Sequence, residues 1–276
     1  MRRWAVAARE NEFALLQRQA GAAMRALWRP RSYLGVVREA LLGGVHLAAY
    51  PLGLLPAAGL TSARRVPTPA PVELPEPTRP PVILIHGYFH NHSAFLVMSR
   101  GLRCAGFDHL HTVDYNPVLA DLNELAERLA QEVQRMLART GARRCVLIGH
   151  SMGGLVARHY VQLLGGDEHV DTVVTLGAPH RGTYSSYLGI GPAAAQLRPG
   201  SAYLRMLDDS ARPSSVRWVA FYSDLDFMVT PAVSAKLVHP ALAATNVRVR
   251  DTGHLSMLLS REVLAAVVAQ LGAVAA

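Results

Sequence analysis

A serine flanked by glycines, set between an apolar run and an expected helix, is the feature that most restricts how this chain can fold. Residues 149–154 read Gly-His-Ser-Met-Gly-Gly and directly follow the apolar run 145–148. In a G-x-S-x-G turn the serine is lifted clear of the sheet edge, and the glycines remove side chains that would collide in so tight a bend. The helix that follows points its first N–H groups toward the oxygen that becomes negative in acyl transfer. Ser151 is therefore the candidate nucleophile.

A nucleophilic serine needs a base and a carboxylate, and candidates for both follow it in the chain. Residues 216–222 and 246–250 are expected strands. Asp224 and Asp226 come just after the first of them, and His254 comes just after the second. His254 would take the proton from the serine, and a carboxylate would fix its tautomer and stabilise the imidazolium. At this point either aspartate can fill the third position.

Strand and helix patterns alternate from residue 82 to the end of the chain. Further strands are expected at 82–85, 109–114, 145–148 and 172–176, and helical spacing of apolar residues recurs over 119–137, 152–164 and from about 262. Such alternation predicts an α/β fold, with a mostly parallel sheet covered by helices on both faces. Sites in these folds lie at the C-terminal ends of the strands, where all the candidate residues fall.

Together these stretches resemble the bacterial lipases and esterases of the α/β-hydrolase superfamily. The resemblance covers roughly residues 80–275 and rests on 81–88 (PVILIHGY), 149–154, 176–183 (LGAPHRGT), 222–229 (YSDLDFMV) and 253–255 (GHL). It implies an α/β-hydrolase fold and a carboxylic ester hydrolase that needs no cofactor. In the family pattern two residues separate Tyr-Ser from the functional aspartate, which selects Asp226. Asp224 is then expected to be a solvated loop carboxylate or a turn cap.

The resemblance also implies an oxyanion hole made of two main-chain N–H groups, those of Tyr88 and Met152. Phe89, His180 and Leu255 are the candidate substrate-binding residues; a structural hydrogen bond is the alternative for His180. No metal is expected, because no cysteine or carboxylate cluster accompanies the other histidines.

The first 65 residues differ in character from the rest. They hold ten arginines against three glutamates, a net charge of +7, whereas the whole chain carries +8. Residues 41–60 have no formal charge and are long enough to cross a bilayer, but His46, Pro51 and Pro56 interrupt them. Three interpretations stay open for residues 1–65: contact with a membrane, at its surface or across it; a helical hairpin packed on the catalytic domain; and a mobile extension. No cleavable signal peptide is predicted, and the expected location is cytoplasmic or at the inner membrane.

Three parts follow from this reading. Residues 1–65 form a basic and hydrophobic helical segment, 66–80 a proline-rich connector, and 81–276 the catalytic domain. Within the last, residues 183–215 interrupt the strand–helix alternation and are too apolar for an exposed loop. We expect them to form a lid over the acyl pocket; the alternative is one further core helix.

Serine-dependent hydrolysis of lipid-like esters is the function that these residues favour. A thioesterase or acyltransferase would use the same triad, since both also pass through an acyl-enzyme. A non-catalytic member that binds hydrophobic ligands is disfavoured by the complete order of serine, aspartate and histidine. Nucleic-acid binding is not expected, because no recognised module accompanies the arginines. The sequence does not indicate an oligomeric state.

Overall fold

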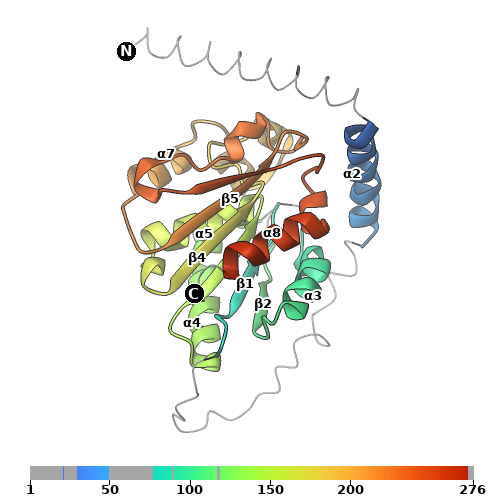
Figure 1. The fold of residues 1–276 in the computed structure, drawn as a ribbon. Coiled ribbons are helices and arrows are strands. Elements are labelled where there is room, and N and C mark those ends of the chain that lie inside the picture. Colours follow the sequence, from blue (N-terminus) through green and yellow to red (C-terminus); the bar gives the residue numbers. More distant parts are fainter. Residues whose placement is uncertain (1–20, 22–29, 50–76, 89, 117–118, 273–276) are drawn as a thin grey trace.

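Six parallel strands form a single sheet in the order β2-β1-β3-β4-β5-β6. The computed structural model describes residues 21, 30–49, 77–88, 90–116 and 119–272 (Figure 1). The strands are β1 (Val82–Ile85), β2 (Leu110–Val113), β3 (Cys145–His150), β4 (Val170–Leu176), β5 (Arg217–Ser223) and β6 (Thr245–Val249). The predicted parallel sheet is thus confirmed, and it brings the C-terminal ends of β3, β5 and β6 to one edge.

Helices cover both faces of the sheet, as the alternation predicts. They are α2 (Pro30–Ala49), α3 (Leu96–Cys104), α4 (Leu122–Thr140), α5 (Met152–Leu163), α6 (Gly191–Gln196), α7 (Ala202–Asp209) and α8 (Arg261–Gly272), with short 3-10 turns that include η4 (Tyr184–Leu188) and η7 (Ser256–Leu258). The helix expected from 119 begins at 122 instead. Asp121 and Glu124 form a capping box there, and the Asp121 carboxylate accepts hydrogen bonds from the first free N–H groups.

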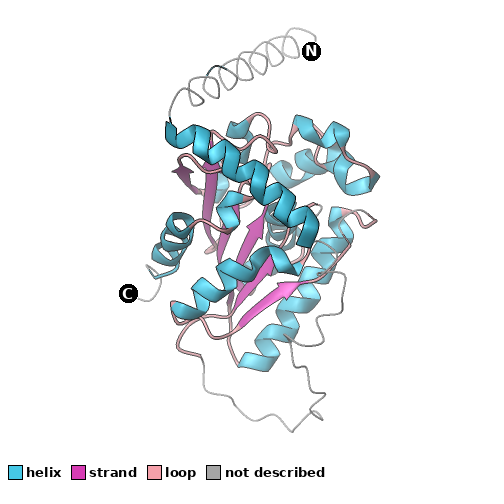
Figure 2. Cartoon of the chain, turned by 90° about the vertical axis from the view of Figure 1, so that its right-hand side faces the viewer, coloured by secondary structure: helices cyan, strands magenta, loops and turns pink. Residues whose placement is uncertain are grey.

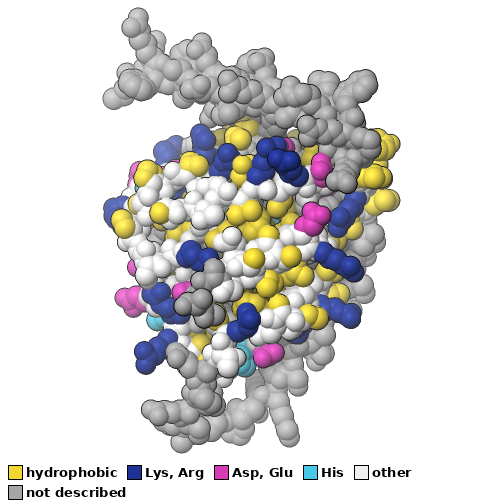
Figure 3. All heavy atoms as spheres, viewed as in Figure 1, with side chains coloured by type: hydrophobic (Ala, Val, Ile, Leu, Met, Phe, Trp, Pro, Cys, Tyr) yellow, Lys and Arg dark blue, Asp and Glu magenta, His cyan; other side chains and the backbone are white. Residues whose placement is uncertain are grey.

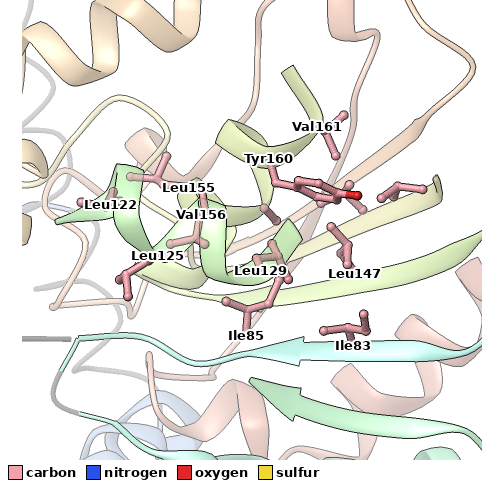
Figure 4. Close-up of a cluster of buried hydrophobic side chains, with 14 of the residues drawn as sticks. Ile83, Ile85, Leu122, Leu125, Leu129, Leu147, Leu155, Val156, Tyr160 and Val161 are labelled. Atoms are coloured by element: carbon pink, nitrogen blue, oxygen red, sulfur yellow. The ribbon is translucent and has the colours of Figure 1, made fainter. Parts of the chain in front are cut away.

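The core has two halves, one on each face of the sheet. Along β1 the side chains alternate, so Ile83 and Ile85 join one apolar cluster while Val82 and Leu84 join the other. The first cluster is closed by α4 and α5, and the second by α3 and α8. Figure 4 shows the first, where side chains of β1 and β3 face those of α4 and α5. This packing on both faces fixes β3, and with it the turn that follows.

The segment 183–215 divides into two structurally different pieces. Its first piece, η4 and α6, lines the cavity that holds Ser151, through residues such as Ser185, Leu188 and Ala194. Its second piece, α7, packs into the core through Tyr203, Leu204 and Leu207. A buried arginine of α5, Arg158, donates to the Asp208 carboxylate at 2.7 Å and to the Leu207 carbonyl at 3.1 Å. Helix α7 therefore corresponds to the core-helix alternative, and a lid role stays a prediction for the first piece.

Helix α2 lies against the α/β domain, beside η7 (Figures 1 and 2). The described part of the N-terminal segment therefore packs on the α/β domain, while the hairpin and the membrane contact remain predictions. Among the described helices, none combines the length and apolar character that crossing a membrane requires. Residues 50–60 of the uncharged stretch, and the connector 66–76, fall outside the described residues, so the three-part division of the chain remains a prediction.

Candidate active site

The turn between β3 and α5 holds Ser151 in a backbone conformation that only close packing sustains. Its φ and ψ are 54° and −126°, a region that residues with a Cβ rarely adopt. A Cβ on Gly153 would lie 2.1 Å from the Ile85 carbonyl oxygen, and one on Gly149 would lie 2.6 Å from the Gly153 carbonyl carbon. The glycines are thus required by the approach of β1 and of the turn itself.

His254 and Asp226 form a buried pair at the end of the sheet. The Nδ1 atom of His254 lies 2.7 Å from Oδ2 of Asp226, and the side chains are 5% and 0% exposed. The other carboxylate oxygen, Oδ1, accepts hydrogen bonds from the N–H groups of Met228 at 3.0 Å and Val229 at 2.8 Å. Asp224 instead pairs with Arg248 at the surface. Of the two candidate aspartates, the structure brings only Asp226 to the histidine.

The surroundings of His254 favour its protonated form. Burial lowers the pKa of the imidazole, but the charge and hydrogen bond of Asp226, with the charge of Glu39, raise it more. The net pKa therefore lies above its ordinary value of 6.5. Two other buried histidines behave in the opposite way: burial lowers the pKa of His86 to about 4, and that of His180 falls well below its ordinary value. His254 differs from them because a buried carboxylate faces it.

The imidazole of His150 packs on His254 from the end of β3. Their ring centroids are 4.5 Å apart, and Nε2 of His150 lies 3.0 Å from the carbonyl oxygen of His254. That nitrogen must carry the proton to bond a carbonyl oxygen. His90 stacks on the other side of His150, at 5.2 Å. His150 thus fixes the main chain at His254.

Ser151 and His254 line the same cavity, of about 450 Å³. This volume is in the usual range of small-molecule sites. Leu255 lines the cavity too, as expected for a substrate-binding residue. Much of the remaining wall comes from the first piece of the segment 183–215 and from the loop after Asp226; these wall residues are Thr183, Ser185, Ser186, Leu188, Gly189, Ala194, Leu197, Phe227, Met228 and Val229. The mouth is apolar, since Leu188 is 90% exposed and Met228 51%.

Tyr88 and Met152, the expected oxyanion-hole residues, flank the serine. Strand β1 ends so close to it that a Cβ on Gly87 would lie 2.7 Å from Cβ of Ser151. Met152 begins α5, and Tyr88 lines the cavity. The Tyr88 hydroxyl donates to the Ile190 carbonyl oxygen and accepts from the Ile190 N–H at 3.1 Å. This side chain therefore ties the end of β1 to the segment that walls the cavity.

The substrate-binding expectation for His180 needs correction. His180 does not line the cavity; its ring is buried, and Nε2 lies 3.0 Å from Oγ1 of Thr175 on β4. The alternative given for His180, a structural hydrogen bond, fits this position, because the bond joins the turn after β4 to Thr175 within that strand. Phe89 lies outside the described residues. Within the part of the chain that the structure describes, no three His, Cys, Asp or Glu side chains gather closely enough to hold a metal ion.

Comparisons with known proteins agree with this fold. Residues 104–187 match the family of PGAP1-like alpha/beta domains. The chain is 32% identical over 144 residues to a triacylglycerol lipase of Burkholderia plantarii, and 28% identical over 128 residues to a GPI inositol-deacylase of Candida albicans. These matches span 49% and 44% of this chain but only 40% and 28% of the relatives, so the chain covers less than half the length of either.

Two solved structures share the fold over most of this chain. The mature lipase BlEst2 of Bacillus licheniformis has a TM-score of 0.62 and 19% identity, over 73% of this chain and 96% of its own. Lipase B of Aspergillus fumigatus has a TM-score of 0.64 and 19% identity, over 73% of this chain and 55% of its own. The chain therefore has the α/β-hydrolase fold. Within this fold the turn at Ser151 and the His254–Asp226 pair stand at the C-terminal edge of the sheet.

The histidine–aspartate pair leaves no room for a side chain at Gly177, and this can be tested. A Cβ there would lie 2.9 Å from Oδ2 of Asp226 and 3.1 Å from Nδ1 of His254. Gly165 is a matched control. Its φ of +71° is close to the +57° of Gly177, but nothing lies within 4 Å of a Cβ added there. Gly177→Ala should displace the pair and lower the His254 pKa in an NMR titration. Gly165→Ala should cost only the backbone strain, about 1 kcal/mol, and leave that pKa unchanged. Equal titration curves would contradict the described contact.

Proposed function

We propose that this α/β-hydrolase is a serine-dependent carboxylic ester hydrolase that acts on lipid-like esters through an acyl-enzyme. One observation carries the proposal: a buried His254–Asp226 pair shares an apolar-mouthed cavity with a serine held in a strained turn. Strained serines, buried ion pairs and cavities each occur without catalysis. Their convergence on one cavity is what acyl transfer requires.

In the proposed first half-reaction, Oγ of Ser151 attacks the ester carbonyl carbon while Nε2 of His254 accepts the hydroxyl proton. Asp226 keeps the proton on Nδ1 and stabilises the imidazolium that forms. The N–H groups of Tyr88 and Met152 bind the oxyanion of the tetrahedral intermediate. Collapse of that intermediate breaks the bond to the alcohol, which leaves with the proton from Nε2. In the second half-reaction water repeats these steps on the acyl-enzyme and releases the acid.

Lipid-like substrates are supported by the shape of the cavity and its rim. Leu188, Phe227 and Met228 are exposed apolar side chains that line the cavity together with Ser151. Ile190, which bonds Tyr88, is exposed as well. Exposed apolar groups around a site favour contact with a hydrophobic ligand or an aggregate of one. The names of the relatives, a lipase and a deacylase, point the same way. In this proposal residues 184–197 serve as the lid.

The first test is hydrolysis of ester substrates from short to long acyl chains, beside the matching thioesters, by the wild type and Ser151→Ala. Loss of the nucleophile should lower kcat by about 10⁴ or more while thermal stability is kept. We expect esters to be preferred and medium or long chains to have the higher kcat/KM. A preference for thioesters, or acyl transfer to an added alcohol at the expense of hydrolysis, would favour the thioesterase or acyltransferase alternative. Equal activity of the variant would reject the nucleophile.

Two neighbouring aspartates give a matched test of the third catalytic position. Asp226→Asn should reduce kcat by about 10⁴, because an amide disfavours the required tautomer of His254. Asp224→Asn changes the same group two residues away and should leave kcat within about twofold, since the carboxylate of Asp224 pairs with Arg248 at the surface. A large loss in the second variant together with a small loss in the first would reverse the assignment.

We further infer that the N-terminal segment contacts a membrane surface. The side chains of Tyr33, Leu34, Val37 and Leu41 on α2 are exposed, and hydrophobic side chains are visible over α2 at the right-hand edge of Figure 3. Lys and Arg side chains surround the face shown there, and residues 1–65 carry a net charge of +7. Apolar side chains beside basic ones fit an anionic lipid surface.

Vesicle sedimentation tests this contact. The full chain should bind phosphatidylglycerol vesicles at low salt more strongly than phosphatidylcholine vesicles, and salt should weaken the binding. Leu34→Ser with Leu41→Ser should reduce it severalfold, whereas Leu119→Ser, which changes an exposed leucine just before α4, should not. A full chain that stays in the supernatant with both lipids would contradict the inference.

A further inference from the structure

A carboxylate from the N-terminal helix reaches the loop that carries the candidate catalytic histidine. Glu39 of α2 accepts hydrogen bonds from the N–H of Leu255 at 2.5 Å and the N–H of Ser256 at 3.0 Å. It also accepts from the Ser256 hydroxyl at 2.6 Å. Leu255 and Ser256 are the two residues directly after His254. One side chain thus satisfies both main-chain donors where the loop enters η7.

Close packing on both sides of Glu39 shows that this contact is built into the fold. A Cβ on Gly253 would lie 2.4 Å from the Glu39 carboxylate, so a larger residue just before His254 would displace that carboxylate. One turn earlier on α2, a Cβ on Gly35 would lie 2.8 Å from the Asp251 carbonyl oxygen. Glycines at both positions let the helix and the loop from 251 to 256 approach within hydrogen-bond distance.

The His254 loop is therefore held from two directions. On the sheet side, His150 bonds the His254 carbonyl oxygen at 3.0 Å. On the outer side, Glu39 bonds the next two N–H groups. The His254 side chain adds its bond to Asp226. Loss of the outer bonds would leave the loop fixed only from the inside, and a shift of about 1 Å in a reacting group can cost about 10²-fold in rate.

We propose that Glu39 is a positioning residue for His254, so that hydrolysis depends on α2 as well as on the catalytic domain. This inference rests on the ester hydrolase function proposed above. Glu39 touches neither the cavity nor Ser151, and it acts through the main chain of residues 255 and 256. The N-terminal helix then completes the site from outside the region that carries the family motifs.

The charge of Glu39 gives the proposal a second readout besides rate. The groups that face His254 are Asp226 from the β5 loop, Glu39 from α2 and His150 from β3, with His90 stacked behind His150. Of the two carboxylates, Asp226 has the larger effect, and both raise the His254 pKa. Removing the Glu39 charge therefore lowers that pKa. Since neutral His254 is the base, the acidic limb of kcat/KM moves to lower pH.

The test compares Glu39→Gln with Glu127→Gln in the full chain. A glutamine at 39 presents one acceptor oxygen and one N–H₂ group to three donors, so it cannot restore the bonds. Glu127 is an exposed glutamate of α4 and serves as the matched control. We expect Glu39→Gln to lower kcat by about tenfold with little change in KM, and to move the acidic limb to lower pH. Glu127→Gln should change neither.

Two further variants separate geometry, charge and folding. Glu39→Asp keeps the charge but shortens the reach, so it should lower kcat while leaving the acidic limb in place. Ser256→Ala removes only the hydroxyl partner, and its effect on kcat should be largely lost in combination with Glu39→Gln, because both changes disrupt one contact. If Glu39→Gln lowers the melting temperature, these two variants still test the positioning role of Glu39.

The outcomes distinguish this proposal from the proposed function. A wild type that hydrolyses no ester, and whose Ser151 does not react with a fluorophosphonate, would refute both. A wild type that hydrolyses esters, beside a folded Glu39→Gln with unchanged kcat and an unchanged acidic limb, would refute the positioning role alone. A variant that loses stability but keeps kcat and the pH profile at low temperature would show that Glu39 only anchors the helix.

Discussion

The approach of β1 to the turn between β3 and α5 is the constraint on which the candidate site depends. The Ile85 carbonyl oxygen stands where a side chain of Gly153 would be, and Gly87 meets the side chain of Ser151. A residue with positive φ costs of order 1–3 kcal/mol, and it persists only where the surroundings determine it. In this protein the apolar packing on both faces of the sheet holds Ser151 in that conformation. The packing fixes β1 and β3 in register, and with it the distance between the two strands. The strained serine is a consequence of sheet packing.

The buried pair beside it follows different physics. Removing a carboxylate from water is expensive unless all its oxygens are satisfied. Asp226 is fully buried and meets that condition, because its oxygens bond two main-chain N–H groups and the imidazole. His86 and His180, buried to a similar extent without such a partner, have lowered pKa values. The carboxylate of Asp226 therefore distinguishes His254 from the buried His86 and His180.

The features that could be predicted from the sequence are those that neighbouring residues determine. The glycine spacing around Ser151 marks the turn, because turn geometry depends on neighbouring residues, whereas the choice of Asp226 over Asp224 came from the resemblance to the family pattern. His180 was expected near substrate, yet its ring bonds Thr175, five positions away. The undetected contacts join residues far apart in the chain. Helix α7 belongs to the core through Arg158, and Glu39 reaches residues more than two hundred positions away. Neither contact leaves a periodic trace that a single sequence shows.

Helix α2 shows why such contacts matter for function. One of its faces carries Gly35 and Glu39 and is fitted to the loop around His254, while Val37 and Leu41 face solvent. The same helix can therefore bind a second surface without releasing the first. A ligand of the outer face would alter the site only if it bound the seated and the displaced helix with different affinity. Lipid contact that leaves α2 in place would bring the protein to its proposed substrate and leave kcat unchanged. Lipid contact that displaces α2 would remove Glu39 from the His254 loop and lower kcat.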